Sequence, residues 1–254
     1  VACLALARRI KEAHPGMCIL FGGSNLEGEM GPELVRSFPF IDYAVVGEGD
    51  AAFPALLQRL AAGRSAADIP GVVSREQGTV VFAGQAPPCH NLDALPTPNY
   101  DAFFERLADL DLLARSQHLS ALPFEASRGC WWGQKHHCVF CGFQREGLAF
   151  RAKSPARVMA ELGELSRRYR ITSFEATDFI LSNDYLDTLL GQLAQDRLDY
   201  HFFWECKANL NRQQLQRAYK GGIRWIQPGI ESLSTHVLRL MNKGCTMLQN
   251  VRFL

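Results

Sequence analysis

The sequence of 254 residues lacks the features that define several classes of protein. No apolar run approaches the ~20 residues that span a bilayer, and a membrane segment is therefore not predicted. The 27 Lys and Arg residues are balanced by 26 Asp and Glu residues, so a strongly basic surface for nucleic acid is not indicated. With 47% hydrophobic and 21% charged residues, the composition excludes disordered, collagen-like and coiled-coil proteins.

The beginning of the chain lacks an initiator Met and lacks a charged region ahead of an apolar stretch, so a signal peptide is not predicted. Residues 1–9 instead have the composition of the middle of a helix, and we expect the chain to be a fragment of a longer protein.

The eight cysteines are not distributed like a disulfide scaffold, which a chain of this length and apolar fraction does not need. Cys130, Cys138 and Cys141 lie within twelve residues of one another. This crowding favours a reduced, cytosolic protein with one metal or cluster site. The other five cysteines are scattered and are predicted to be ordinary buried thiols: Cys3, Cys18, Cys89, Cys206 and Cys245.

Residues 17–62 alternate short apolar runs with amphipathic segments, a pattern that predicts strand, loop and helix twice over. Units of this kind form parallel sheets, whose ligands gather at loops beyond the carboxyl ends of the strands. The predicted strands are residues 17–21 and 43–46, the loops Gly22-Gly23 and Gly47-Glu48-Gly49, and the helices residues 31–38 and 53–60.

Turn signals dominate residues 63–118, and we interpret this stretch as a linker that contains one small hairpin. Regular alternation resumes at residue 121, where four β/α units favour a parallel barrel or a doubly wound sheet. Four units are too few to close a barrel, so the sheet is expected to keep an unpaired edge. The predicted strands are residues 72–73 and 79–82 in the linker, then 122–127, 171–177, 200–207 and 223–230.

Capping signals place helices between these last strands. Ser154 followed by Pro155 predicts a helix start, and Asn183 is a candidate cap for the next helix. Gly221-Gly222 is typical of a helix end, and Ser232 or Ser234 can cap the helix after it.

The three crowded cysteines have the spacing C-x7-C-x2-C and follow the first strand of the second region. A structural zinc site needs a fourth ligand, which His136 or His137 could supply, but zinc ribbons usually pair one C-x2-C with a second, and none follows. Three cysteines in a loop above a parallel barrel instead suit a four-iron cluster with one iron open to a ligand. A zinc site and an unligated set of thiols remain the alternatives.

With these motifs the chain resembles the radical S-adenosylmethionine enzymes, and in particular the cobalamin-binding C-methyltransferases that mature ribosomally synthesised peptides such as bacteriocins. The commoner spacing in the superfamily is C-x3-C-x2-C, so the first interval here is four residues longer, which favours this subfamily over the tRNA-modifying branches. The residues that carry the resemblance are Gly22-Gly23-Ser24-Asn25, Gly28-Glu29-Met30-Gly31, Gly47-Glu48-Gly49-Asp50, Cys130-Trp131-Trp132-Gly133, His137-Cys138, Phe140-Cys141-Gly142, Gly229-Ile230-Glu231-Ser232 and Met241-Asn242-Lys243-Gly244.

The resemblance implies an α/β architecture in which a partial Rossmann-like cobalamin-binding domain precedes a partial (β/α) barrel. Residues 1–65 would be the later half of the cobalamin domain, residues 66–118 the linker, and residues 119–254 the first part of the barrel. The implied cofactors are a [4Fe-4S] cluster on Cys130, Cys138 and Cys141, S-adenosylmethionine and cobalamin. In such enzymes an electron from the cluster cleaves S-adenosylmethionine to a radical that abstracts hydrogen, and methylcobalamin supplies a methyl group.

Candidate contacts to these cofactors follow from the resemblance and from position at strand ends. Related enzymes commonly hold the amino group of S-adenosylmethionine with Gly-Gly-Glu, where this chain has Glu175-Ala176-Thr177-Asp178. An internal ion pair competes with a ligand contact for Glu205 and Lys207, and helix capping competes for Glu231. The predicted contacts are Phe140, Gly142, Thr177, Asp178, Glu205, Lys207, Gln227, Glu231 and Ser232, with Gly22, Gly23, Ser24, Gly47, Glu48 and Gly49 toward cobalamin.

The sequence therefore predicts a cytoplasmic, cobalamin-dependent radical enzyme that methylates carbon in a peptide precursor. It would receive electrons from a donor such as flavodoxin or ferredoxin and would have no nucleic-acid or membrane partner. Two alternatives remain. One is a radical enzyme that makes another modification with a vestigial cobalamin domain, and the other is a zinc-stabilised protein that binds a leader peptide.

Overall fold

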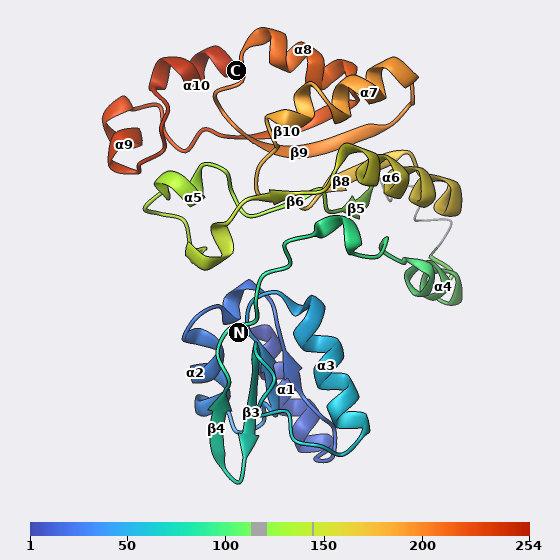
Figure 1. The fold of residues 1–254 in the computed structure, drawn as a ribbon, viewed down its shortest axis with the longest axis vertical. Helices are drawn as coiled ribbons and strands as arrows, with labels where there is room; N and C mark the ends of the chain where they lie inside the picture. Colours follow the sequence, from blue (N-terminus) through green and yellow to red (C-terminus); the bar gives the residue numbers. More distant parts are fainter. Residues whose placement is uncertain (113–120, 144) are drawn as a thin grey trace. The chain divides into compact units, whose positions relative to one another are not determined.

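The computed structural model describes residues 1–112, 121–143 and 145–254, and these form two compact units, Val1–His90 and Asn91–Leu254 (Figure 1). The predicted linker reaches residue 118 and the predicted barrel domain starts at residue 119. The part of these predictions that falls on residues 113–120 lies outside the described residues. Within the part of the chain that is described, no helix is both long and apolar enough to cross a membrane.

The first unit is a four-stranded sheet with helices on both faces (Figure 1). Ala44 and Val73 pack in one core cluster with Val35 of α2, whereas the neighbouring Val45 and Val72 pack in another with Leu56 of α3. The elements are α1 (Ala2–Ala13), β1 (Leu20–Phe21), the 3-10 helix η1 (Ser24–Leu26), α2 (Met30–Ser37), β2 (Tyr43–Val45), α3 (Gly49–Ala61), β3 (Val72–Glu76) and β4 (Thr79–Phe82).

The predicted hairpin is present and extends this sheet. β1 and β2 are parallel, but β3 pairs antiparallel with β2, and β4 pairs antiparallel with β3. The turn between β3 and β4 consists of Gln77 and Gly78, which both have positive φ (48° and 84°). Two-residue turns of this kind match the twist of antiparallel strands, so the chain reverses here and adds to the sheet.

The second unit contains a parallel sheet whose spatial order, β10-β9-β8-β5, follows the order of the strands in the chain, read from β5 (Figure 1). Each new strand is added on the same side with helices between, which is the winding of a (β/α) barrel and agrees with the predicted partial barrel. The parallel strands are β5 (Leu122–Phe124), β8 (Ser173–Ala176), β9 (His201–Lys207) and β10 (Ile223–Gly229). The helices that follow them are α6 (Pro155–Tyr169), α7 (Leu189–Asp196), α8 (Arg212–Lys220), α9 (Thr235–Leu240) and α10 (Met247–Phe253).

The aromatic residues Phe124, Phe174, Phe202 and Trp204 form the centre of the second core, with leucines of the helices packed against them. The strand predicted over residues 122–127 is divided. β5 ends at Phe124, and Ser127 belongs to β6 (Ser127–Arg128), which pairs antiparallel with β7 (Arg151–Ala152).

Three of the predicted helix boundaries are confirmed and one is wrong. The Ser154 hydroxyl accepts the N–H of Arg157 at 3.1 Å, Ser234 caps α9, and α8 ends at Gly221. Asn183 makes no capping hydrogen bond, because a 3-10 turn (η5, Asp184–Leu186) intervenes and α7 begins only at Leu189.

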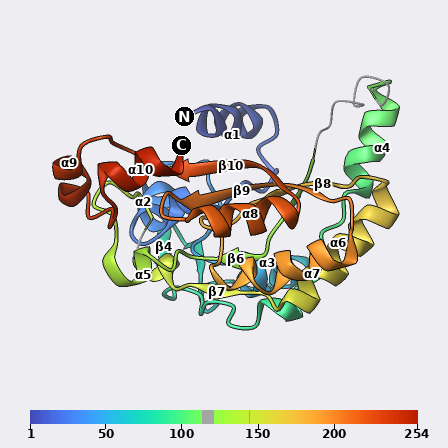
Figure 2. The same cartoon turned by 90° about the horizontal axis from the view of Figure 1, so that it is seen from above.

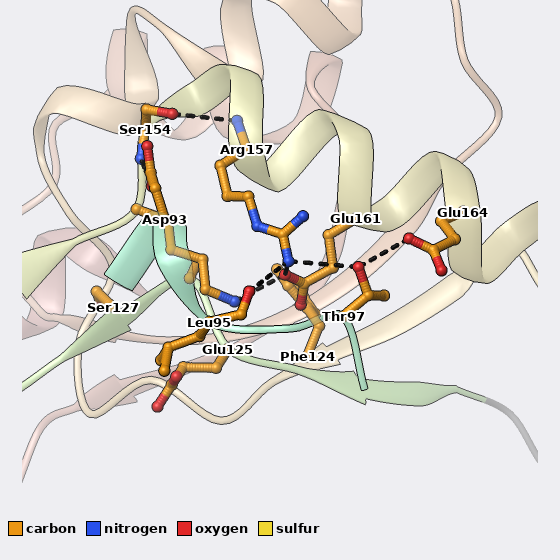
Figure 3. Close-up of polar contacts among 12 residues, drawn as sticks. Asp93, Leu95, Thr97, Phe124, Glu125, Ser127, Ser154, Arg157, Glu161 and Glu164 are labelled. Atoms are coloured by element: carbon orange, nitrogen blue, oxygen red, sulfur yellow. Dashed lines mark hydrogen bonds and ion pairs between the residues drawn. The ribbon is translucent and has the colours of Figure 1, made fainter. Parts of the chain in front are cut away.

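The second half of the predicted linker is bound to α6 through polar contacts (Figure 3). Asp93 accepts the N–H of Ser154 at 2.7 Å, the carbonyl of Leu95 accepts Arg157 at 2.7 Å, and Thr97 donates to Glu164 at 2.8 Å. This segment, with the 3-10 helix η2 (Leu92–Ala94) and α4 (Asp101–Asp109), therefore belongs to the second unit.

Candidate cluster and cofactor site

The three crowded cysteines lie in the connection between β6 and β7, which also contains the short helix α5 (Gly133–His136) and a 3-10 turn (η4, Arg145–Leu148). All three line one cavity of about 430 Å³ at the carboxyl ends of β9 and β10. The other residues around the cavity are Trp132, Gly133, His137, Phe140, Phe143, Leu148, Phe179, Ile180, Glu205, Cys206, Lys207, Gln227, Pro228, Gly229, Ile230, Glu231 and Lys243.

The chemistry of the donor set suits an iron–sulfur cluster, because three thiols line the cavity and thiolates are the ligands that hold four-iron clusters. Within the described residues no group of three His, Cys, Asp or Glu side chains is arranged to hold a single metal ion. The N–H of Gly133 donates to Cys130 Sγ at 3.3 Å, a contact of the kind that tunes cluster potentials.

Two lysines give the cavity positive charge beside the thiols. Burial raises the pKa of the Cys138 thiol, and the ammonium groups of Lys243 and Lys207 partly oppose this effect. Lys243 Nζ also lies 2.9 Å from Glu231 Oε1 and 5.4 Å from the centre of the Phe140 ring. Lys243 was missed as a site residue, although it lies in the motif Met241-Asn242-Lys243-Gly244 that carries part of the resemblance.

Glu205 and Gln227 are paired in register on β9 and β10, and both face the cavity. Within the described residues the Glu205 side chain makes no hydrogen bond or ion pair, and burial raises the pKa of its carboxyl. The alternative of an internal ion pair with Lys207 is wrong, because Lys207 Nζ instead donates to the carbonyl of Lys243 and lies 3.7 Å from the centre of the Trp132 ring. Glu205 is therefore the carboxyl group most available to a ligand.

His137 adds a second available polar group. Its Nε2 atom is buried beside the cavity and has no hydrogen-bond partner among the described residues. Its backbone has a positive φ of 44°, a conformation that costs energy for a residue with a side chain and that clusters at functional sites.

Several predicted contacts do not line the cavity. Ser232 Oγ accepts the N–H of Ser234 at 3.0 Å and so shapes the loop before α9. Glu231 does line the cavity, and its alternative role as the cap of α9 is wrong, because Ser234 caps that helix. Gly142 is exposed and has open space around its Cα. Thr177 is exposed, and its hydroxyl donates to the carbonyl of Phe124 at 3.2 Å.

Asp178 is buried and holds protein groups together, whereas the sequence predicted that it would contact a cofactor. It accepts the N–H groups of Ala126 and Ser127 at 2.8 and 2.9 Å, the Ser127 hydroxyl at 2.9 Å and the Trp204 indole at 3.2 Å. Burial raises the pKa of its carboxyl to about 6, against the lowering effect of these hydrogen bonds. Asp178 thereby joins the end of β8 to the start of the connection between β6 and β7 that contains the three cysteines, which we call the cysteine loop, and so positions this loop.

The loops predicted to contact cobalamin follow β1 and β2, two adjacent parallel strands, at the same edge of their sheet. Gly23 and Gly47 have positive φ (98° and 81°), and no atom lies within 4 Å of an added Cβ at either position. Gly22 and Ser24 lie in the first loop, and Gly49 begins α3. Glu48 has a role within the protein, since its Oε2 accepts the N–H of Cys89 at 2.7 Å.

The remaining cysteines are not all buried, contrary to the prediction. Cys3 and Cys18 are exposed and Cys89 is half-buried, whereas Cys206 and Cys245 are buried. Cys206 also lines the cavity, which its isolated position in the sequence gave no reason to expect.

Two solved structures superpose on nearly the whole of this chain. The cobalamin-dependent S-adenosylmethionine radical enzyme OxsB, with aqua-cobalamin and S-adenosylmethionine bound, superposes with a TM-score of 0.70 at 19% identity, over 97% of this chain and 35% of that one. The radical methyltransferase TsrM from Kitasatospora setae, with cobalamin and a [4Fe-4S] cluster bound, gives a TM-score of 0.69 at 19% identity, over 99% and 50%. This chain has their fold.

Curated relatives extend the likeness to sequence. An uncharacterized methyltransferase of Pyrococcus horikoshii is 30% identical over 97% of this chain and 52% of its own length. The hopanoid C-3 methylase of Methylococcus capsulatus is 25% identical (96% and 45%), and the anaerobic magnesium-protoporphyrin IX monomethyl ester cyclase of Rubrivivax gelatinosus is 24% identical (95% and 43%). The chain thus spans about half the length of these relatives. No protein-family model matches it.

Proposed function

We propose that this chain is part of a cobalamin-dependent radical S-adenosylmethionine enzyme that transfers a methyl group to carbon. The observation that carries the proposal is the placement of Cys130, Cys138 and Cys141 around one cavity at the carboxyl ends of the strands, in the fold of OxsB and TsrM. The methyltransferase and methylase named among the curated relatives support methyl transfer.

The residues of the cavity have distinct roles in this proposal. The three thiolates would hold a [4Fe-4S] cluster, which would supply the electron for cleavage of S-adenosylmethionine, and cobalamin would supply the methyl group. Lys243 and Lys207 offset the negative charge of the thiolates. Glu205 is free to accept hydrogen bonds from a bound ligand, and Phe143 and Phe179, whose ring centres lie 4.0 Å apart, form an apolar part of the wall.

The proposal also names a class of substrate, which is a peptide. Two aromatic residues that line the cavity are also strongly exposed, Phe140 at 48% and Phe179 at 41%, and the adjacent Val139 is 72% exposed. An apolar rim of this kind is suited to contact with an extended chain. We propose a ribosomally synthesised precursor peptide as substrate, and flavodoxin or ferredoxin as electron donor in the cytoplasm.

The test of the cluster uses the full-length protein, purified and reconstituted without oxygen. Cys138→Ala should abolish formation of 5'-deoxyadenosine from S-adenosylmethionine, because one of three thiolates is lost. Cys3→Ala, which removes an exposed thiol of the first unit, is the matched control and should keep the wild-type rate. Equal rates in all three proteins would refute the assignment of the cluster ligands.

The test of the substrate uses S-adenosylmethionine with a ¹³C-labelled methyl group and a candidate ribosomal precursor peptide. The expected result is a labelled methyl group on a carbon atom of the peptide, detected by tandem mass spectrometry. Cleavage of S-adenosylmethionine without transfer of the label to the peptide would refute the proposal that the peptide is the methyl acceptor.

A second candidate function is a radical reaction without methyl transfer. The observation in its favour is the magnesium-protoporphyrin cyclase, which matches 95% of this chain and is not named as a methyltransferase. The same labelling experiment separates the two functions, since this second reaction would change the substrate without adding the labelled carbon.

A further inference from the structure

The segment after α9 crosses the cysteine loop and holds it by several contacts. The N–H of Val139 donates to the carbonyl of Met241 at 3.1 Å. The side-chain amide of Asn242 donates to the carbonyl of His137 at 3.1 Å and to that of His136 as well. Figures 1 and 2 place α5, in the cysteine loop, and α9 at the same end of the second unit.

Trp132, in the cysteine loop, also takes part in this junction between the loop and the segment after α9. Its indole N–H donates to the carbonyl of Asn242 at 3.1 Å, and its ring stacks on His136 with the ring centres 4.1 Å apart. The thiol of Cys138 also lies near the carbonyl of Asn242, with Sγ 3.9 Å from the oxygen. One backbone carbonyl is therefore approached by both an indole and a predicted cluster ligand.

Lys207 connects this junction to the sheet. Its ammonium donates to the carbonyl of Lys243 and lies over the Trp132 ring, 3.7 Å from the ring centre. Only 5% of the residue is exposed, so both contacts are desolvated and correspondingly strong. The end of β9 is thereby attached both to the cysteine loop and to the segment after α9.

The backbone at the junction requires particular residues. Gly244 has a positive φ of 66°, and a Cβ at this position would overlap the six-membered ring of Trp132. Asn242 also has a positive φ (54°), which asparagine tolerates better than most residues with a side chain. Both positions therefore combine an unusual backbone conformation with a direct contact to the loop.

We infer that Asn242 and Gly244, together with Trp132 and Lys207, form a clasp that fixes the cysteine loop against the carboxyl end of β9. These are positioning residues, which act through the loop on the placement of Cys138. Lys207 thus acts through Trp132 and Lys243 in addition to lining the cavity. The inference deepens the proposed function, because what the loop holds is the proposed cluster, but the clasp consists of protein contacts alone.

The first experiment measures thiol accessibility in the full-length protein without a cluster. Gly244→Ala forces Trp132 away, Trp132→Phe removes the indole N–H, and Asn242→Gly keeps the backbone conformation but removes the amide. In each variant we expect Cys138 to react with a maleimide about tenfold faster or more, since each loses a contact that is worth about this factor. Peptide mass spectrometry resolves the rate at each cysteine, and the exposed Cys3 serves as an internal reference.

Matched controls separate the clasp from general damage. Gly78→Ala carries the same cost of positive φ, but an added Cβ at Gly78 has open space. Trp225→Phe removes an indole N–H from a residue that is 57% exposed. Both controls should label Cys138 at the wild-type rate, and circular dichroism should show native helix content in all five variants. Unchanged labelling of Cys138 in the three folded clasp variants would overturn the inference.

The second experiment measures iron retained per chain after anaerobic reconstitution and desalting, with the electron paramagnetic resonance spectrum of the reduced protein. We expect the three clasp variants to retain less than about half of the wild-type iron and to show altered g-values, because the thiolates are misplaced. Faster labelling with unchanged iron and unchanged g-values would overturn the role of the clasp in holding a cluster. A protein that takes up zinc and no iron would refute the proposed function, and the labelling result would still decide the clasp.

Discussion

The ion pair between Lys153 and Glu161 leads to the most quantitative prediction. Lys153 Nζ lies 2.7 Å from Glu161 Oε2, and the two side chains are only 2% and 1% exposed. Arg157 lies 3.5 Å from the same carboxylate oxygen, at the point where the segment of residues 93–97 meets α6 (Figure 3). The substitution Glu161→Gln preserves the volume of the side chain but leaves the ammonium of Lys153 buried without a counter-charge.

Breaking one side of a buried ion pair costs about 3–5 kcal/mol, because the remaining charge stays desolvated. An unpaired ammonium at 2% exposure belongs in this range. The double substitution Lys153→Met with Glu161→Leu removes both fully buried charges, and it should restore much of the stability. The charge that loses its carboxylate is then Arg157, whose side chain is 21% exposed and still donates to the carbonyl of Leu95. Glu164→Gln is the control on the same helix, because Glu164 is exposed and a glutamine oxygen can still accept from Thr97.

Hydrogen–deuterium exchange of α6 in the full-length protein measures this effect without requiring two-state unfolding of the whole molecule. We expect the slowest amides of α6 to exchange about 10²- to 5 × 10³-fold faster in Glu161→Gln, which corresponds to the free energy above. Glu164→Gln should change these rates by less than about threefold. A rate in Glu161→Gln within threefold of wild type would refute the reasoning.

Two further predictions concern the carboxyl groups of the buried Asp178 and the half-buried Glu205. Asp178, whose pKa burial raises to about 6, keeps its proton in the native state at a pH where the unfolded chain has lost it. Its contribution to stability therefore falls by about 3 kcal/mol as pH rises from ~4 to ~6, and Asp178→Asn should flatten this slope in melting curves measured across that range. A variant with the wild-type slope would refute this assignment. Glu205→Gln loses no partner within the described residues, so the melting temperature should stay the same or rise while 5'-deoxyadenosine formation falls about tenfold or more. Loss of stability in this variant would contradict the account of Glu205 as a group reserved for a ligand.

Local features of the fold were predictable because their causes are local. Ser154-Pro155 starts α6 and Gly221 ends α8, since capping depends on residues that are neighbours in the chain. The alternation of strands and helices likewise predicts the parallel sheet of the second unit. The extension of the first sheet by β3 and β4 was not expected, because the turn signals around the hairpin were attributed to a linker.

The less predictable features depend on residues far apart in the sequence. The predicted strand over residues 122–127 is divided because Asp178, some fifty positions away, accepts the N–H groups of Ala126 and Ser127. The clasp joins Trp132 to Asn242 across 110 positions. No spacing rule connects such residues, so the sequence predicts that three cysteines act together but not what holds their loop in place.

The iron and sulfide content of the reconstituted protein, measured together with its cleavage of S-adenosylmethionine, tests the central claim most directly. The full-length protein, reconstituted anaerobically and desalted, should contain about four iron and four sulfide ions per chain and should release 5'-deoxyadenosine from S-adenosylmethionine when reduced. Cobalamin retained by the same sample would support the methyl-transfer version. About one zinc ion per chain with no iron and no cleavage of S-adenosylmethionine would contradict the account.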